Sequence, residues 1–337
     1  MIKILYIGND LLKNTKYTTT MDTLSNLLEQ EKYTIYKSSS KTNKFLRLLD
    51  MCRAIVKHRD TVQYVLIDTY STVNFYYAYI TAQLCRLFRL KYVPILHGGN
   101  LPERINRSKT LSRDLFCNAY KNVSPSNYLK VAFEKKGYQT ELIPNVLEIE
   151  NYSFKQRDTI APKLLYVRSF ADIYNPTMAV KVLYELKKSH SEAELCMVGP
   201  DKDGTLLKVK EMITDLKLED SVTITGVLSR EKWHKLSENY DIFINTTNFD
   251  NTPVSVLEAM ALGLPIVSTN AGGIPYLIDN EKDGVLVTKD AASEMTEAIL
   301  SLMSSNKKAQ EISKNARTKV EQYGWDSVKH KWFDILE

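Results

Sequence analysis

Short apolar runs alternate along this chain with longer segments in which apolar residues recur every three or four positions. Several of the short runs are apolar without interruption, as in Val65–Ile67, which is typical of parallel strands that helices cover on both faces. The pattern predicts strands at Ile2–Ile7, Tyr64–Asp68, Val93–Leu96 and Glu141–Pro144 in the first half, and at Leu164–Arg168, Glu194–Gly199, Val222–Gly226, Asp241–Asn245, Ile266–Thr269 and Gly284–Val287 in the second.

The segments between these runs have the periodicity of amphipathic helices. Strands and helices therefore alternate in each half of the chain, which predicts two doubly wound α/β domains with parallel sheets. The predicted helices are Met21–Glu31, Pro176–Ser189, Thr205–Leu216, Arg230–Glu238, Val254–Leu262 and Ala291–Met303.

A polar segment between Glu148 and Pro162 breaks this pattern and marks the domain boundary. We place the first domain at residues 1–155, the second at 156–318 and a C-terminal helical segment at 319–337. Ligands of open α/β sheets bind beyond the carboxyl ends of the strands. Two such sheets that face each other are expected to form an interdomain cleft, so the residues that follow each strand are candidates for a site.

Composition excludes several classes of protein. The 337 residues are 44% hydrophobic and 25% charged, which excludes a disordered chain and a disulfide scaffold. The four cysteines are far apart in the sequence and are expected to be buried thiols in a reducing cytosol. The net charge of +5 is spread evenly, which argues against a nucleic-acid partner. The chain starts on a strand and its most apolar stretch, Val73 to Leu90, contains two arginines, so we expect a cytoplasmic protein.

The segment from Asn245 to Pro265 has the features of a phosphate-binding loop that leads into a helix. Thr252 suits the N-cap of that helix and Pro253 its first position. The amides of Val254 and Ser255 are then expected to point out of the positive helix end, where they could bind a phosphate group.

Two carboxylates, Asp250 and Glu258, flank this helix start. Amides and a helix dipole suit a diphosphate, and carboxylates suit sugar hydroxyls, so the combination predicts a sugar-nucleotide site. The alternative is that Asp250 is a turn residue and Glu258 a solvated helix residue, because helix starts of this kind are common.

A histidine and two glycines follow the predicted strand Val93–Leu96. Gly98 and Gly99 allow a ligand to approach the backbone closely, and His97 can donate or accept a proton near neutral pH. We expect these three residues to be functional; a structural histidine is the alternative. The remaining histidines, among them His234, are expected at the surface.

The segment from Lys41 to Arg59 is helical and strongly basic. Its expected apolar stripe packs against the core, which leaves a solvated basic face. The alternative is that the basic face binds anionic lipid headgroups and collects a lipid-linked acceptor. The predicted stripe consists of Phe45, Leu48, Leu49, Cys52 and Val56.

The string from Asp250 to Pro265, followed by Val267–Pro275, resembles the signature of the family 4 retaining glycosyltransferases, or glycosyltransferase group 1. These have the GT-B fold of two Rossmann-like domains. The resemblance runs over nearly the whole chain and includes Ser124–Ser126, Ile143–Asn145 and Leu195–Pro200. It implies that the last helix crosses back to the first domain and that the enzyme needs no metal.

The resemblance also implies roles for individual residues. Glu258 should bind the nucleotide ribose, Asp250 the donor-sugar hydroxyls, and the turn amides the diphosphate. Arg168 should stabilise the leaving phosphate, and His97 should face the donor sugar near the reacting carbon. The remaining donor-side positions implied are Thr252, Val254, Ser255, Gly199, Asn245 and Gly8, with Gly98, Gly99 and Lys16 in the acceptor or sugar loops.

Three departures from the family pattern stand out. The first carboxylate is Asp250 instead of Glu, and Tyr174–Asn175 stands where the family has Lys. The glycine-rich turn after the first strand is reduced to Gly8–Asn9, with Lys16 near the place of its basic residue. These departures keep two alternatives open: a non-catalytic protein that binds a sugar nucleotide or a partner, and a sugar-nucleotide epimerase of the same fold.

The resemblance predicts a retaining, metal-independent transfer of a hexosyl group to a hydroxyl of a glycan or lipid-linked acceptor. The donor is expected to be a nucleoside diphosphate sugar, with UDP or GDP as its nucleotide, and no cofactor is expected. Such a reaction belongs to surface polysaccharide or glycolipid synthesis. The expected location is the cytoplasm, on the inner face of the membrane as a peripheral protein.

Overall fold

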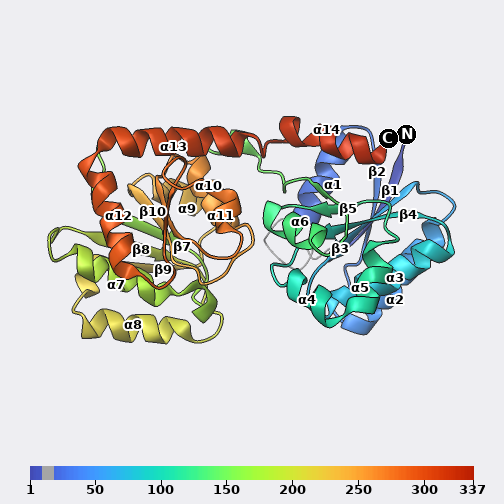
Figure 1. The fold of residues 1–337 in the computed structure, drawn as a ribbon, viewed down its shortest axis with the longest axis horizontal. Coiled ribbons are helices and arrows are strands. Elements are labelled where there is room, and N and C mark those ends of the chain that lie inside the picture. The colour runs from blue at the N-terminus through green and yellow to red at the C-terminus, as the bar shows by residue number, and fades with distance from the viewer. Residues whose placement is uncertain (10–18) are drawn as a thin grey trace. The chain divides into compact units, whose positions relative to one another are not determined.

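The computed structural model describes residues 1–9 and 19–337. These form two compact units, one made of Met1–Leu147 together with Tyr323–Glu337 and the other of Glu148–Gln322 (Figure 1). The division after Leu147 lies earlier than the position expected from the sequence, residue 155. The segment that contains Tyr152 therefore belongs to the second unit.

A parallel sheet in the order β2-β1-β3-β4-β5-β6 forms the centre of the first unit. Its inner strands are continuously apolar because helices cover both faces. The strands are β1 (Lys3–Ile7), β2 (Thr34–Ser38), β3 (Tyr64–Thr69), β4 (Lys91–Leu96), β5 (Asn122–Ser124) and β6 (Thr140–Leu142). The helices are α1 (Thr20–Gln30), α2 (Lys44–His58), α3 (Asn74–Leu87), α4 (Leu101–Arg107), α5 (Lys109–Phe116), α6 (Asn127–Glu134) and α14 (Trp325–Leu336).

The two faces of this sheet bury different helices (Figure 1). One face packs against α2, α3, α5 and α6 through a cluster that includes Met51, Phe75 and Phe116. The other face packs against α1 and α14, the helix at the C-terminal end, whose Trp332 and Leu336 are buried beside Ile4 and Leu28. The indole N–H of Trp325 also donates to Glu31 at 3.1 Å.

The second unit has the same architecture, with a parallel sheet in the order β12-β11-β10-β7-β8-β9. The strands are β7 (Lys163–Val167), β8 (Glu194–Val198), β9 (Val222–Gly226), β10 (Ile242–Asn245), β11 (Ile266–Thr269) and β12 (Val285–Val287). The α-helices are α7 (Pro176–Leu186), α8 (Thr205–Asp215), α9 (Arg230–Ser237), α10 (Val254–Ala261), α11 (Ile274–Leu277), α12 (Ala292–Ser304) and α13 (Asn306–Glu321). Short 3₁₀ turns occur at Ile149–Asn151, Asp172–Tyr174 and Glu219–Ser221.

The prediction of two doubly wound parallel sheets is confirmed, and each of the ten predicted strands is present. The prediction missed two strands in the first unit. Strand β2 mixes polar and apolar residues because it lies at the sheet edge, and β5 has only three residues, too few to give a periodic signal.

Two expectations about buried side chains are wrong. Cys117 is exposed and Cys52 half-buried, so only Cys85 and Cys196 fit the expected buried thiols. In α2, the buried residues are Met51 and Ile55 instead of the predicted stripe, because the helix turns a different face toward the sheet. The predicted stripe residues Phe45, Leu49 and Val56 are exposed, whereas Leu48 and Cys52 are half-buried.

Candidate functional site

The carboxyl ends of the central strands of the second unit bring several predicted residues together. Arg168 follows β7, Gly199 follows β8, and Asn245 ends β10, and these strands are neighbours in the sheet. A Cβ at Gly199 would lie 2.1 Å from the carbonyl oxygen of Arg168, so only glycine allows the backbones to approach this closely. Gly199 thus acts by supporting Arg168.

The predicted residues Arg168 and Asp250 form an ion pair between Nη2 and Oδ2. Burial raises the pKa of Asp250, and the charge of Arg168 opposes this shift. The guanidinium carbon of Arg168 also lies 4.2 Å from the ring centroid of Tyr174, a cation–π contact. Tyr174 is one of the two residues, with Asn175, that the resemblance places where the family pattern has lysine.

Two buried polar atoms beside this pair have no hydrogen-bond partner among residues 1–9 and 19–337. They are Nε of Arg168, just after β7, and the hydroxyl of Tyr166, in β7. Unsatisfied buried donors are costly and call for an explanation.

The loop that carries Asp250 is held by the loop after β11. The N–H of Gly273 donates to the carbonyl oxygen of Asp250 at 2.7 Å. Gly272 has a φ of +59°, and a Cβ there would lie 2.3 Å from the same oxygen. The paired glycines of the sequence motif are therefore needed for this close contact between two loops, which fixes the position of the carboxylate.

Helix α10 begins at Val254, the first residue of the predicted range Val254–Leu262, but its cap differs from the prediction. Its N-cap is Pro253, with no side-chain cap hydrogen bond, so the expectation that Thr252 is the N-cap is wrong. Extended backbone at Pro253 delays the first helical turn to Val254. Val254 and Ser255 still lead the helix, where amides have no intrahelical acceptor, so the predicted anion-binding geometry remains.

Glu258 is buried in α10 and lies in a cluster of polar side chains. Its Oε1 accepts a hydrogen bond from the hydroxyl of Tyr152 at 2.9 Å and forms an ion pair with Nε of Arg230 at 2.8 Å. Burial raises the pKa of Glu258, and the charge of Arg230 opposes the shift. The carboxylate is therefore not a solvated helix residue.

His234 lies in the same cluster, with Nε2 4.0 Å from Oε1 of Glu258. The expectation that this histidine is a surface residue is wrong, because its side chain is only 13% exposed. Burial and the charge of Arg230 lower its pKa to about 4, so His234 is neutral at pH 7. Tyr152 and His234 carry no motif that identifies them in the sequence. Their association is shown by the structure, in which their ring centroids lie 4.8 Å apart and both side chains lie beside Glu258.

Asn245 has an internal contact in this structure: its side chain is buried and donates to the hydroxyl of Ser268 at 2.9 Å. The nearby acidic pair Asp201 and Asp203 also binds protein groups. Their carboxylates accept from the backbone N–H groups of Gly204 and Thr205. Within the described residues, no group of three or more His, Cys, Asp or Glu side chains could hold a metal ion.

The first unit presents a second cluster at the carboxyl ends of β1, β3 and β4. Nε2 of His97 lies 2.9 Å from Oδ1 of Asp68, and both side chains are buried. The hydroxyl of Tyr6 donates to the same oxygen at 3.0 Å. Burial and the Asp68 charge raise the pKa of Tyr6, so its hydroxyl remains a donor. The ring of Tyr70 stacks against His97, with centroids 5.3 Å apart.

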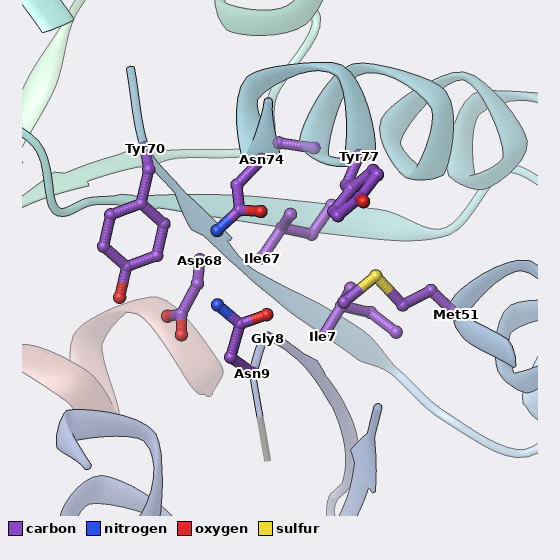
Figure 2. Close-up of a pocket in the computed structure, with 10 residues that line it drawn as sticks. Ile7, Gly8, Asn9, Met51, Ile67, Asp68, Tyr70, Asn74 and Tyr77 are labelled. Carbon is purple, nitrogen blue, oxygen red and sulfur yellow. The ribbon is translucent and has the colours of Figure 1, made fainter. Parts of the chain in front are cut away.

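Gly8 adjoins this cluster, because a Cβ there would lie 2.5 Å from Oδ2 of Asp68. Figure 2 shows Asp68, Tyr70 and Asn9 on one side of a small pocket whose other side is lined by Ile7 and Met51. The predicted residues Gly8 and His97 thus meet through Asp68. Sequence reasoning missed Asp68, although it follows the apolar run of β3, which is where a site residue is expected.

The remaining predicted residues lie in loops. Gly98 packs closely on Ser71, since a Cβ would lie 3.0 Å from the backbone nitrogen of Ser71, and its carbonyl oxygen accepts the N–H of Leu101. Gly99 lies in the turn before α4. Lys16 lies outside the described residues.

These features define a class of protein: two parallel α/β units of the GT-B fold, the second with a helix start that has no side-chain cap and lies between two carboxylates in the sequence. The sequence profile of the family described as "Glycosyl transferases group 1" matches residues 149–319. The match covers more than half of the chain, and the chain belongs to this family.

Named relatives are similar over most of the chain. The amylovoran biosynthesis glycosyltransferase AmsK of Erwinia amylovora is 27% identical over 284 residues, which cover 79% of this chain and 69% of that protein. The putative colanic acid biosynthesis glycosyltransferase WcaL of Escherichia coli (strain K12) is 30% identical over 252 residues, which cover 70% of this chain and 61% of that protein. The chain thus belongs to the glycosyltransferase group 1 family, and the names of these two relatives place those proteins in polysaccharide biosynthesis.

Solved structures share the fold. Sucrose-phosphate synthase (tll1590) from Thermosynechococcus elongatus superposes with a TM-score of 0.79 at 14% identity, covering 99% of this chain and 98% of that one. Anabaena Alr3699/HepE, in complex with UDP and glucose, superposes with a TM-score of 0.75 at 16% identity, covering 100% and 99%. Among the helices of the described residues, none is both long and apolar enough to cross a bilayer.

Proposed function

We propose that this protein transfers a hexosyl group, with retention of configuration, from a nucleoside diphosphate sugar to a hydroxyl of a glycan or a lipid-linked acceptor. The observation that carries the proposal is the arrangement of Arg168, Asp250 and Glu258 around the start of α10. One cation and two free amides suit a diphosphate, and two buried carboxylates suit hydroxyl groups on either side of it.

Arg168 is the residue that stabilises the leaving group in this proposal. As the bond from the anomeric carbon to the diphosphate oxygen breaks, negative charge grows on that oxygen. The guanidinium and the amides of Val254 and Ser255 stabilise this charge, which is usually the largest catalytic contribution. Nε of Arg168 is buried and has no protein acceptor among the described residues.

Transfer then needs a base for the acceptor. We assign this role to the departing phosphate oxygen, because the acceptor approaches from the face that the phosphate leaves. The acceptor oxygen bonds to the anomeric carbon, and its proton moves to the phosphate. Asp250 and His97 position sugar hydroxyls, and Glu258 binds the ribose. No step requires a metal, so transfer is expected to continue in EDTA.

The nucleotide is proposed to be UDP or GDP. Support for UDP comes from Anabaena Alr3699/HepE, whose structures contain UDP, UDP with glucose, or UDP-glucose. The names of the relatives in amylovoran and colanic acid biosynthesis support a surface polysaccharide as the product. We place the reaction in the cytoplasm, at the inner face of a membrane to which the protein binds peripherally.

A second candidate is a non-catalytic protein that binds a sugar nucleotide. One specific observation favours it: Arg168, the cation assigned to the leaving group, already has its charge paired with Asp250. A protein of this kind would bind the nucleotide sugar but would not consume it.

Melting-temperature shifts with UDP, GDP, ADP, CMP and their sugars, in EDTA, test the proposal. At about 100 times its dissociation constant, the true ligand should add roughly 2.7 kcal/mol to the free energy of unfolding. We expect one diphosphate to stabilise the protein and Glu258→Ala to abolish the effect. Binding without consumption of the donor, whatever acceptor is present, would support the second candidate. The absence of a shift with every nucleotide would contradict both.

A further inference from the structure

Exposed apolar side chains are concentrated on two neighbouring helices of the first unit. Among the described residues, sixteen large apolar side chains are exposed, and half of them belong to α2, α3 or the N-cap of α3. Phe45 is 68% exposed and Leu87 is 72% exposed. The eight residues are Phe45, Leu46, Leu49 and Val56 from the first helix and Val73, Tyr76, Ile80 and Leu87 from the second.

The exposed residues of each helix share one face. Val73, Tyr76, Ile80 and Leu87 are spaced by three, four and seven positions, which places them in one line along α3. Phe45, Leu49 and Val56 of α2 are spaced by four and seven positions and form a second line. The two lines constitute what we call the α2–α3 face.

Both lines point away from the same side of the sheet. The opposite faces of the two helices, with Met51 and Ile55 in α2 and Phe75 and Ala78 in α3, are buried in one cluster on the sheet. The helices also contact each other, since the hydroxyl of Tyr77 donates to the carbonyl oxygen of Lys44 at 3.1 Å. The α2–α3 face therefore lies on two neighbouring helices that bury their other sides in the same cluster, drawn in blue and cyan in Figure 1.

The charge of the two helices is strongly positive. Together they contain five Lys or Arg residues and one acidic residue, Asp50. In the part of the chain that the structure describes, Arg53 and Lys57 form no ion pair, and both side chains are exposed. Helical spacing places Arg53 between Leu49 and Val56, so cationic and apolar groups alternate on this face.

We propose that the α2–α3 face binds an anionic lipid surface, with its apolar side chains at the acyl boundary and its Lys and Arg side chains at the headgroups. Contiguous exposed apolar surface marks an interaction site, and amphipathic helices rich in Lys and Arg bind anionic membranes in this way. The proposal rests on the proposed function in one respect: a lipid-linked acceptor would be presented at this surface.

The positive charge of the α2–α3 face favours an anionic lipid surface as its partner over a second copy of the chain. A symmetric dimer through this face would place the same positive patch on both partners, and like charges across an interface oppose association. An anionic lipid surface has the complementary charge. Burial of the apolar side chains adds the hydrophobic contribution that a purely basic patch lacks.

Flotation with vesicles tests the proposal, using phosphatidylcholine alone and phosphatidylcholine mixed with phosphatidylglycerol. We expect binding only to the mixed vesicles, weakened by salt. Leu49→Glu with Ile80→Glu, and separately Arg53→Glu with Lys57→Glu, should each lower the affinity by about tenfold or more. Leu207→Glu is the matched control, because Leu207 is 63% exposed on α8 of the second unit; this variant should bind normally.

A second measurement reports insertion directly. Phe45→Trp should show a blue shift of its added tryptophan emission with mixed vesicles and no shift with phosphatidylcholine. Equal binding to both vesicle types, or normal binding by the Leu49/Ile80 variant, would overturn the proposal. So would a stable dimer that the same variant dissociates, since the face would then be covered by a second copy.

The outcome can be separated from that of the proposed function. Flotation needs neither donor nor acceptor, and nucleotide-induced melting shifts need no lipid. A Leu49/Ile80 variant that keeps its nucleotide shift but loses vesicle binding supports the surface assignment. A parent protein that shows the nucleotide shift and floats with no vesicle leaves the nucleotide site standing and refutes the surface.

Discussion

The guanidinium of Arg168 lies on the ring of Tyr174, 4.2 Å from the centroid, while its Nη2 group pairs with Asp250. By its resemblance to the family pattern, the segment Tyr174–Asn175 stands where a lysine is expected. An aromatic face cannot supply that charge, but it holds the guanidinium in a fixed orientation. Tyr174 is therefore a positioning residue for Arg168.

Replacing Tyr174 by leucine should lower kcat by about 3- to 30-fold, because a cation–π contact contributes roughly 0.5–2 kcal/mol. Tyr174→Phe keeps the ring and is the matched control, with activity close to that of the parent. Steady-state transfer rates of the two variants provide the test. Equal rates for the leucine and phenylalanine variants would show that the ring does not position Arg168.

Arg168→Ala should lower transfer by about 10²-fold or more, as expected when a group that stabilises a developing anion is removed. Nucleotide-induced melting shifts show whether the donor site survives the change. Arg168→Lys retains a charge but loses the planar guanidinium, so we expect an intermediate rate. An alanine variant with unchanged turnover would be incompatible with the proposed mechanism.

Glu258→Gln should have two distinct effects, one on the pH dependence of stability and one on the affinity for the nucleotide. Burial raises the pKa of Glu258 above its ordinary value of 4.5, so the ionised carboxylate is disfavoured in the folded protein. The Glu258 carboxyl therefore contributes favourably to the free energy of unfolding below pH 4.5, and this contribution is lost as the pH rises through the raised pKa. The glutamine variant lacks this pH dependence, so its melting temperature relative to the parent should rise across that interval.

The same variant should lose affinity for the nucleotide, because a neutral amide accepts hydrogen bonds from the ribose less strongly than a carboxylate does. Paired melting curves with and without UDP, from acid to neutral pH, measure both effects. If the variant binds UDP as tightly as the parent, Glu258 does not bind the ribose. The half-exposed side chain of Arg230 can reach solvent when its partner is neutral.

Asp68→Asn should reduce kcat by about tenfold to 10²-fold through His97, because a hydrogen bond to a charged group contributes roughly 1.5–3 kcal/mol. Tyr6→Phe removes one hydrogen bond to the same carboxylate and should have a smaller effect. A double-mutant cycle with His97→Ala shows whether Asp68 changes kcat through His97. In the His97→Ala background, Asp68→Asn should change kcat little; a full additive loss would mean that Asp68 acts independently.

The two-sheet architecture follows from the chain's local chemistry. Uninterrupted apolar runs such as β3 require cover on both faces, so alternating strands and helices specify a doubly wound sheet. The sequence motif also places Asp250 and Glu258 correctly around the start of α10, because they are close in the sequence and share one loop and helix. The spacing of these two residues in the sequence was therefore enough to predict their positions relative to the start of α10.

Contacts between distant parts of the chain were not predictable in this way. Tyr152 and Glu258 are 106 positions apart, and Asp68 and His97 are 29 apart. Asp68 and His97 meet because the neighbouring strands β3 and β4 end at the same edge of a sheet, which depends on strand order. Tyr152 and Glu258 meet because the segment before β7 packs against α10. His234 likewise looks like a surface residue until α9 packs it beside Glu258.

Helix α2 also has some features that the sequence determines and others that depend on tertiary packing. Its sequence determines that it is helical, basic and apolar on more than one face. Which apolar face is buried depends on the rotation of the helix against the sheet, and that rotation is set by packing with neighbours such as α3. Sequence by itself therefore determined the fold class and the local site motif. Tertiary packing decided which side chains meet and which remain exposed, because both depend on contacts that periodicity does not encode.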